Sequence, residues 1–333
     1  HARDKARSEL AVFKNSLNGK ETSGTYAPAS LLYYHFSRFL QTRVQVPVAV
    51  VAEFPATDYL QRVVAPGLAF SGSSRQKMLH AGWLEMQQAL ESPESYGHRA
   101  SLFTGDGQHL WGVMLMFAGK RYGAEINGTR ASGWGDGQNR DFQRTAPFLA
   151  LRVDQPLAQA IASAIDEARR DPAMAKDLPV DIEPRQVAWW MGEIAEIVVL
   201  DTILGQQDRV GNIDYQWRWL WQEDGLQMSS SRPPQGIDAH RLKVSWLNDN
   251  DAGVYSGYAN YASRTAMLEG WFHMDPGLYR RLQDLALDFE GNGPAAQALR
   301  SNYRLPPREA DAIVRRTLEV AAALQKRCQA GQL

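Results

Sequence analysis

The residues best suited to chemistry lie close together near the middle of the chain, just after an apolar run that ends at Gly205. They are Asp208, Arg209, Asn212 and Asp214. A carboxylate in such a loop can orient or deprotonate an attacking hydroxyl, and an amide oxygen can bind a divalent cation. The segment therefore predicts phosphoryl transfer, with Asp208 as the catalytic residue. The alternative for Asp208 is an ordinary hydrogen-bond acceptor in a helix C-terminal turn.

A second acidic segment follows, in which Asp249 and Asp251 flank Asn250. Carboxylate oxygens are ligands that Mg²⁺ prefers, so at least one of the two is expected to hold a metal ion that bridges phosphates. The Asp-x-Gly shape of residues 251–253 favours Asp251. The same composition is also typical of an exposed turn, which is the alternative.

A lysine completes the set, because Lys14 ends the apolar run SELAVFK. As a point charge it can bind the α- and β-phosphates of a nucleotide. Alternatively it is a solvated lysine at a strand end.

Both strands and helices must position these residues. Strands are expected at 8–14, 44–54 and 213–221, and a pair of strands around a Gly-Asp-Gly turn at 101–117. Helical periodicity predicts helices at 28–40, 77–90, 155–170, 184–204, 275–289 and 306–328. The stretch 119–144 lacks periodicity and is expected to be a long surface loop.

The distribution of these elements predicts an α+β fold in two parts. Residues 1–146 would form an N-terminal nucleotide-binding lobe with an antiparallel sheet. Residues 147–333 would form a mainly helical catalytic lobe, with the boundary near 146–156. We also expect five tryptophans to pack in the core rather than form a stacking surface. They are Trp189, Trp190, Trp217, Trp219 and Trp221. The glycine-rich segment 133–137 is expected to be a flexible loop near the site, because no helix is expected after it.

Three segments together resemble atypical kinases. The run ILGQQDRVGN is similar to the catalytic loop of the secretory-pathway Fam20-like kinases, the HipA-like kinases and the phosphatidylinositol kinases. LAVFKN around Lys14 resembles their Phe-Lys strand, and KVSWLNDNDAGV resembles their metal-binding Asp loop. The three segments occur in the same order as in those families, and the resemblance spans most of the chain.

The resemblance implies a two-lobed protein-kinase-like fold that binds ATP with Mg²⁺ or Mn²⁺. Asp208 would face the acceptor hydroxyl, Lys14 would hold the phosphates, and Asp251 and Asn212 would hold the metal. Lys14 and Asp251 would then be in ionic contact. The acceptor, whether a protein, a glycan or a small molecule, stays open. The other possibilities are a pseudokinase that acts as a binding or scaffold module, and AMP transfer on the same fold.

This chain departs from the family pattern in two places. Asn212 stands one residue closer to Asp208 than the family's metal-binding Asn does, so Asp214 could share its role. The helix Glu that should pair with the lysine is replaced by Ser30, which leaves Glu21 or Glu53 as substitutes. The strands and the glycine-rich loop that precede the lysine in those families are not visible before Ser8, so the nucleotide-binding lobe is expected to be truncated at its start.

Composition sets limits on other functions. The chain has 333 residues, a formal charge of −1, 44% hydrophobic and 22% charged residues, which is typical of a globular protein. The charge gives no reason to expect nucleic acid as a partner, and no apolar run is long enough for a transmembrane segment. A single Cys, Cys328, excludes an internal disulfide and a cysteine zinc site. The chain begins at His1, so a removed leader or a longer parent chain is expected; ATP supply favours the cytoplasm, and export after leader removal stays open.

Overall fold

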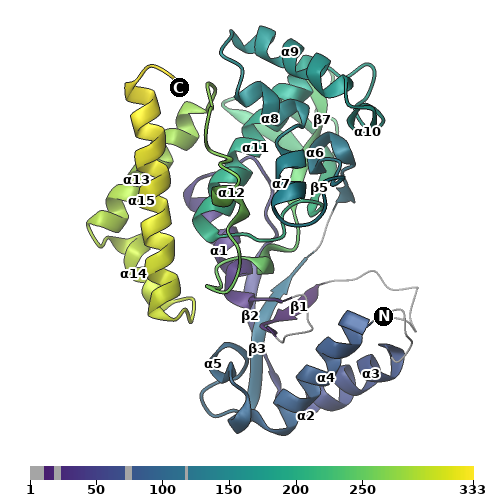
Figure 1. The fold of residues 1–333 in the computed structure, drawn as a ribbon, viewed down its shortest axis with the longest axis vertical. Coiled ribbons are helices and arrows are strands. Elements are labelled where there is room, and N and C mark those ends of the chain that lie inside the picture. The colour runs from purple at the N-terminus through teal and green to yellow at the C-terminus, as the bar shows by residue number, and fades with distance from the viewer. Residues whose placement is uncertain (1–10, 19–23, 72–76, 117–118) are drawn as a thin grey trace.

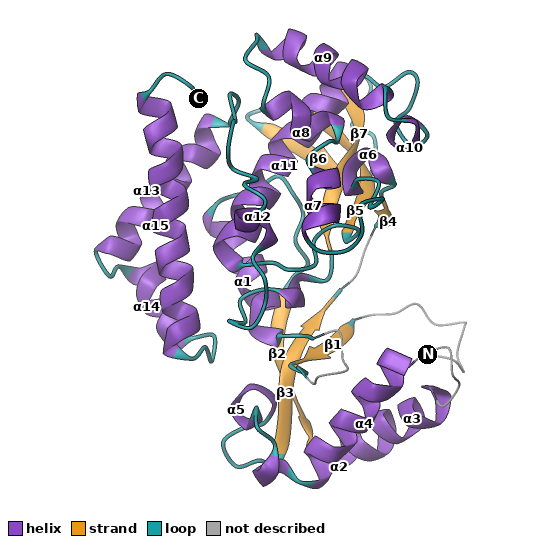
Figure 2. Ribbon diagram, viewed as in Figure 1, coloured by secondary structure: helices purple, strands orange, loops and turns teal. Residues whose placement is uncertain are grey.

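The computed structural model describes residues 11–18, 24–71, 77–116 and 119–333. These residues form a mixed α/β structure with small antiparallel sheets and a helical C-terminal region (Figure 1, Figure 2). Within these four segments, no helix combines the length and the apolar character that crossing a membrane requires.

The first sheet has three antiparallel strands in the order β1-β3-β2. They are β1 (Val12–Asn15), β2 (Ala49–Pro55) and β3 (His109–Leu115). The central strand β3 is mostly buried, as expected for a strand with a neighbour on each side. The register places Lys14 opposite Val113, so the end of the predicted strand 8–14 is confirmed, while Ser8–Leu10 lie outside the described residues.

Short helices pack beside this sheet around a small separate hydrophobic cluster, which includes Val64, Met86 and Leu110. In Figure 1 they lie at the lower end of the molecule. They are α2 (Ala56–Tyr59), the π-helical turn η1 (Leu60–Val64), α3 (Ala65–Ser71), α4 (Lys77–Glu91), the 3₁₀ turn η3 (Pro93–Ser95) and α5 (Arg99–Leu102). The helix predicted at 77–90 is therefore confirmed as α4.

The second sheet is built around its long strand β5 (Ile213–Gln222), which pairs with β7 on one side and with β4 and β6 on the other. Its strands are β4 (Lys120–Arg121), β5 (Ile213–Gln222), β6 (Leu226–Ser229) and β7 (Ala239–Leu247). The outer edge of β7 is satisfied by side chains: the amide of Lys243 donates to Gln186, and the amide of Ser245 donates to Glu193. These bonds fix the strand that leads into the acidic segment.

The remaining helices form the larger body of the protein. They are α1 (Ala27–Phe39), α6 (Ala124–Asn127), α7 (Asp136–Phe142), α8 (Ala146–Leu151), α9 (Leu157–Arg169), α10 (Pro172–Ala175), α11 (Pro184–Leu204), α12 (Tyr261–Arg264), α13 (Pro276–Glu290), α14 (Pro294–Ser301) and α15 (Pro307–Gln329). The long helices occur where periodicity predicts them, within a residue or two at each end.

Helix α11 is the centre of this body. Nearly all of its residues are buried, because it is apolar on every side and contacts α1, α8, α9, α15 and β7. Pro184 starts it, and Gly205 ends it with a left-handed backbone (φ +66°), the conformation that glycine adopts most easily. The apolar run thus ends at Gly205 as the sequence indicates, and the turn delivers the chain directly into the Asp208 loop.

The prediction of a long surface loop at 119–144 is wrong. This stretch contains β4, α6 and α7, and many of its polar side chains are buried, among them Asn127, Gln138, Asn139 and Asp141. Asn127 shows the reason: its side chain donates to the carbonyls of Tyr122 and Ile213. Polar groups hold the segment against the second sheet, so it shows no apolar periodicity. A helix also follows the 133–137 segment, contrary to the expectation.

Two other expectations need correction. Residues 101–117 do not form two strands, because α5 and an isolated bridge from Phe103 to Leu110 stand in place of the first one. Trp189 and Trp190 are buried as expected, but Trp217 is 43% exposed and Trp219 and Trp221 are only half-buried. Alternation along β5 puts these three side chains on a face of the sheet that no helix covers fully.

The predicted boundary at 146–156 falls on helix α8, which packs against α9 and α11. Its apolar side chains belong to the same hydrophobic cluster as those of α1 and α11. The division of the chain into 1–146 and 147–333 stays a prediction.

Candidate functional site

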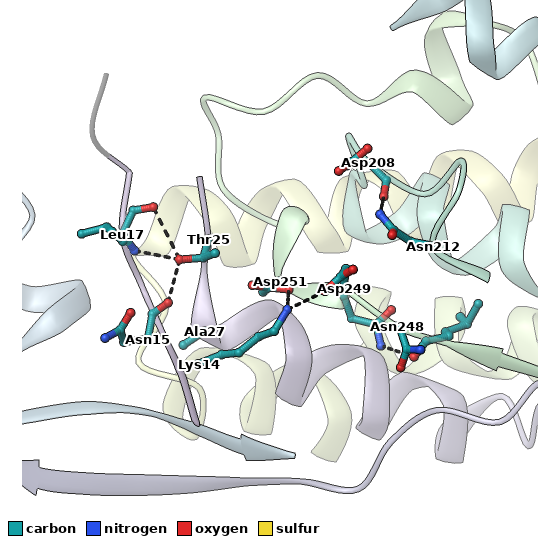
Figure 3. A network of polar contacts seen from close by, with 12 residues as sticks. Lys14, Asn15, Leu17, Thr25, Ala27, Asp208, Asn212, Asn248, Asp249 and Asp251 are labelled. Carbon is teal, nitrogen blue, oxygen red and sulfur yellow. Dashed lines mark hydrogen bonds and ion pairs between the residues drawn. The ribbon is translucent and has the colours of Figure 1, made fainter. Parts of the chain in front are cut away.

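Lys14 connects strand β1 to the acidic segment that contains Asp249 and Asp251. Its Nζ lies 2.8 Å from Oδ1 of Asp249 and 2.7 Å from Oδ1 of Asp251, and donates a hydrogen bond to each (Figure 3). The lysine comes from β1, and 237 positions separate it from Asp251. The predicted contact between Lys14 and Asp251 is therefore present.

The environment of Lys14 keeps its side chain charged. Burial alone would lower the pKa of its ammonium group, but the charges of Asp251 and Asp249 outweigh burial, so the pKa is raised. A lysine that stays protonated is the form that can attract phosphate oxygens.

The two aspartates differ in exposure. The side chain of Asp251 is 4% exposed and that of Asp249 is 41% exposed. Asp249 has a left-handed backbone (φ +48°), after which the turn η4 (Asn250–Ala252) begins. Asp tolerates this conformation better than most residues. The amide of Tyr26, just before α1, donates to the carbonyl of Asp251 at 2.8 Å and ties the turn to that helix.

Asp208 lies on the loop after α11 and is partly buried. Burial, and after it the negative charge of Asp249, raises the pKa of its carboxyl, while the positive charge of Arg209 lowers it. The structure thus brings the predicted catalytic residue into electrostatic contact with the acidic segment that Lys14 binds.

Asn212 and Asp214 are oriented by an arginine that sequence reasoning missed. Asn212 donates to the carbonyl of Asp208 at 2.7 Å, and its Oδ1 accepts a hydrogen bond from Arg121 at 2.8 Å (Figure 3 shows the first bond). The same guanidinium lies 2.5 Å from Oδ1 of Asp214. Arg121 could not be recognised from the sequence, because it falls within the stretch expected to be a loop.

A buried network fastens the Asp208 loop to its neighbours. Arg209 pairs with Asp201 of α11 at 2.9 Å, and Tyr33 of α1 donates to the same carboxylate at 2.6 Å. Arg209 also donates to the carbonyl of Asn248 and to the side chain of Asn250, each at 2.9 Å. Arg209 is therefore a structural ion-pair partner, and it links the loop to the acidic segment.

Glu21 and Glu53 are the residues considered in place of the helix Glu that, by the resemblance to kinases, should pair with Lys14. Glu53 pairs with Arg304 at 2.7 Å on β2, and Glu21 lies outside the described residues. Ser30, at the position where the resemblance to kinases predicts a Glu, is buried in α1 and lines a small recess together with Lys14 and Asp249.

The oxygen donors of the site suit a hard divalent cation. No described residue donates to Oδ2 of Asp249 or Asp251, and Oδ1 of Asn248 is buried without a hydrogen-bond partner among the described residues. Carboxylate and amide oxygens are the protein ligands of Mg²⁺. In the described part of the chain, no three His, Cys, Asp or Glu side chains cluster closely enough to hold a metal by themselves. A cation held by these oxygens would need its remaining ligands from phosphates and water.

A cavity of about 330 Å³ opens beside Lys14 and Asp251. Its walls are mainly apolar and aromatic, with Phe13 from β1, Tyr59 from α2, and Trp83 and Met86 from α4. Such a volume and lining are typical of small-molecule sites. Trp83 could not be singled out from the sequence, because it follows the ordinary apolar face of helix α4.

Comparison with protein-family models finds no match, and a search among curated proteins finds none either.

Proposed function

We propose that this protein is an ATP-dependent phosphotransferase with a two-lobed, kinase-like fold, residues 1–146 forming the nucleotide-binding lobe and 147–333 the catalytic lobe. The observation that carries the proposal is the double contact of Lys14 with Asp249 and Asp251. A strand lysine and an acidic turn from distant parts of the chain meet beside an apolar cavity, with a third carboxylate nearby. This is the set of groups that phosphoryl transfer needs: cations for the phosphates, ligands for a metal, and an acceptor for a proton.

Each residue has one role in this proposal. Lys14 binds phosphate oxygens of ATP, and the base lies in the aromatic cavity next to it. Asp251, with Asp249 and Asn212 in support and Asp214 behind them, would hold Mg²⁺ or Mn²⁺. When bound, the cation would neutralise negative charge on the phosphates.

Asp208 accepts the proton of the attacking hydroxyl. Its raised pKa supports this role, because a base works best when its pKa lies nearer the working pH. The buried pair of Arg209 and Asp201 holds the loop in place, so that orientation is set before the substrate arrives.

One observation favours the second candidate, a pseudokinase that binds nucleotide without turnover. The amide oxygen of Asn212, which would bind the cation, accepts a hydrogen bond from Arg121. The guanidinium would compete with a cation for this oxygen, so the chain could keep the fold with weakened metal binding. AMP transfer on the same fold is the third possibility, since it uses the same groups.

Calorimetric titration of the protein with ATP, with and without Mg²⁺, tests the proposal. Binding that requires the cation supports a nucleotide enzyme, and the absence of binding under both conditions refutes the proposal. Mass spectrometry after incubation with ATP then separates the outcomes: a mass gain of phosphate indicates kinase activity, a gain of AMP indicates AMP transfer, and binding without any product indicates a pseudokinase.

A further inference from the structure

One side of the second sheet carries a row of aromatic side chains. Because side chains alternate along a strand, four residues of β5 point to the same side, namely Tyr215, Trp217, Trp219 and Trp221. Six residue steps separate the first from the last, so the row is about 20 Å long. On β7, Lys243 stands opposite Trp217 and Arg241 stands opposite Trp219, on the same side of the sheet. These six residues are called the tryptophan face below.

Two exposed arginines lie over this row. Cζ of Arg241 is 5.0 Å from the ring centroid of Trp217, and Cζ of Arg232, which follows β6, is 5.1 Å from the ring centroid of Trp219. A cation–π contact holds a guanidinium group without using its N–H donors. No described residue forms an ion pair or a hydrogen bond with either arginine side chain. Each arginine is therefore oriented by an indole while its donors stay available for a ligand.

The tryptophan face is positively charged. Besides the two arginines, Lys243 lies 4.5 Å from the ring centroid of Tyr215, and the exposed Lys120 of β4 stands opposite the same tyrosine. Glu125 balances Lys243 at 3.6 Å, and Glu223 accepts a hydrogen bond from the last indole of the row, but neither pairs with an arginine of the face. The whole chain has a formal charge of −1, so this concentration of cations is local. Charge complementarity therefore calls for an anionic partner.

We propose that the tryptophan face binds an extended acidic segment of a partner protein, with an Asp or Glu at every second residue. The rings that orient Arg241 and Arg232 are two positions apart on β5, a repeat of about 6.8 Å. An extended peptide presents alternate side chains on one side with the same repeat. Its carboxylates can therefore pair with successive guanidinium groups, in the bidentate geometry that arginine favours.

The contacts within the face favour a peptide over other anionic partners. Nucleobases, like sugars, stack on open aromatic rings, but Trp217 and Trp219 already hold guanidinium groups. A membrane surface takes up apolar side chains that project into it, whereas Trp219 and Trp221 lie half-buried along their strand. The row also follows a single strand, which suits a single extended chain.

Fluorescence anisotropy of the full chain with labelled octapeptides tests the proposal. In one peptide Glu and Thr alternate, a second has the same composition with all of its Glu residues in one block, and a third has Lys in place of Glu. The alternating peptide should bind best, because all of its carboxylates can point to one side, whereas only half of those in the block can. The Lys peptide should not bind. Added salt should weaken binding, because the charges that meet are exposed to solvent.

Variants of the two arginines measure their part in binding. Arg241→Gln and Arg232→Gln should each weaken the binding of the alternating peptide about threefold to fivefold, and the double variant about tenfold. Arg218→Gln is the matched control, because Arg218 belongs to the same strand but points to the other side of the sheet, with Leu242 opposite it. Trp217→Ala removes the ring that orients Arg241 and should weaken binding, whereas Trp217→Phe keeps a ring and should lose less.

Three results would overturn the proposal: the alternating peptide has no Kd below about 1 mM, the block peptide binds equally well, or the double variant binds as the wild type does. Other occupants are tested with an oligo-dT, polygalacturonate and phosphatidylserine vesicles. If one of these binds more tightly than the peptide and loses its binding in the double variant, the face serves that class of partner and the peptide is rejected. None of these outcomes depends on the phosphotransferase function, which nucleotide binding tests separately.

Discussion

Lys14 and Asp251 are in ionic contact at 2.7 Å, although one belongs to the first strand and the other to a turn 237 positions later. Asp251 is the more buried of the two aspartates that Lys14 touches. A buried carboxylate needs its cation more than an exposed one does, because water cannot replace the partner. We therefore expect Asp251 to matter more to the site than Asp249.

Asp251→Asn should reduce Mg²⁺-dependent ATP binding more severely than Asp249→Asn. The buried side chain has a fixed orientation, and removing its charge takes away both a cation ligand and one of the two carboxylate partners of Lys14. Calorimetric titration with and without Mg²⁺ measures the difference. If Asp249→Asn is the more damaging change, then the exposed aspartate is the principal ligand and the assignment of this turn is wrong.

Asp208→Ala should lower turnover by roughly 10²–10⁴, the range for a positioned acid–base group. The fold should survive, because Asp208 lies on a partly exposed loop whose anchor is the separate pair of Arg209 and Asp201. Steady-state kinetics and a thermal melt check the two halves of the prediction. Turnover at the wild-type rate would remove Asp208 from the mechanism.

Arg121→Ala should let the divalent cation bind at lower concentration, by roughly tenfold, or about 1.4 kcal/mol. The guanidinium now bonds Oδ1 of Asn212 and lies beside Asp214, so its removal frees both oxygens. A Mg²⁺ titration at fixed ATP measures the change, and Arg121→Lys, which keeps the charge, is the control. Weaker binding in Arg121→Ala would instead mean that the arginine contacts the phosphates.

The sequence predicts those parts of the site that depend on single residues at recognisable positions. Lys14 and Asp251 could be paired because both stand at the ends of recognisable segments that the kinase pattern brings together. The orienting groups could not be found in this way. Arg121 lies in a stretch whose short elements are held by buried polar side chains such as Asn127, and such contacts leave no periodic pattern.

The fold likewise has parts that the sequence predicts and parts that it does not. Helix α11 was predicted with its correct bounds, because a long apolar run with a proline at its start and a glycine at its end admits few alternatives. The side chains of β5 were placed wrongly, since alternating tryptophans look like core residues. Only the tertiary structure shows that Trp217 lies on a face where Arg241 and Lys243 cover it incompletely.

Arg209→Met should lower the free energy of unfolding by about 3–5 kcal/mol, because it leaves the carboxylate of Asp201 buried without its partner. The side chains of Arg209 and Asp201 are 4% and 6% exposed. Denaturant unfolding measures the loss. The control is Arg315→Met, which removes an exposed ion pair to Glu319 on α15 and should change stability by no more than about 0.5 kcal/mol. Equal effects of the two changes would contradict a structural role for the buried pair.

Glu193 makes stability depend on pH. This side chain of α11 is fully buried, and burial raises the pKa of its carboxyl to about 8, although Ser245 and Trp189 donate hydrogen bonds to it. The folded protein therefore holds a proton that the unfolded chain releases near its ordinary pKa of 4.5. Stability is fully present below that pKa and is lost as the pH rises toward about 8, where the dependence levels off.

Glu193→Gln should remove this part of the pH dependence, since the amide is neutral throughout and can still accept from Trp189 and bond Ser245. Denaturant midpoints measured from pH 5 to 9 compare the two proteins. Glu196, whose pKa burial raises to about 7, contributes a slope of the same sign to both, so the test is the difference between the curves. The variant should gain stability relative to the wild type as the pH rises. Parallel curves would show that Glu193 does not carry the proton.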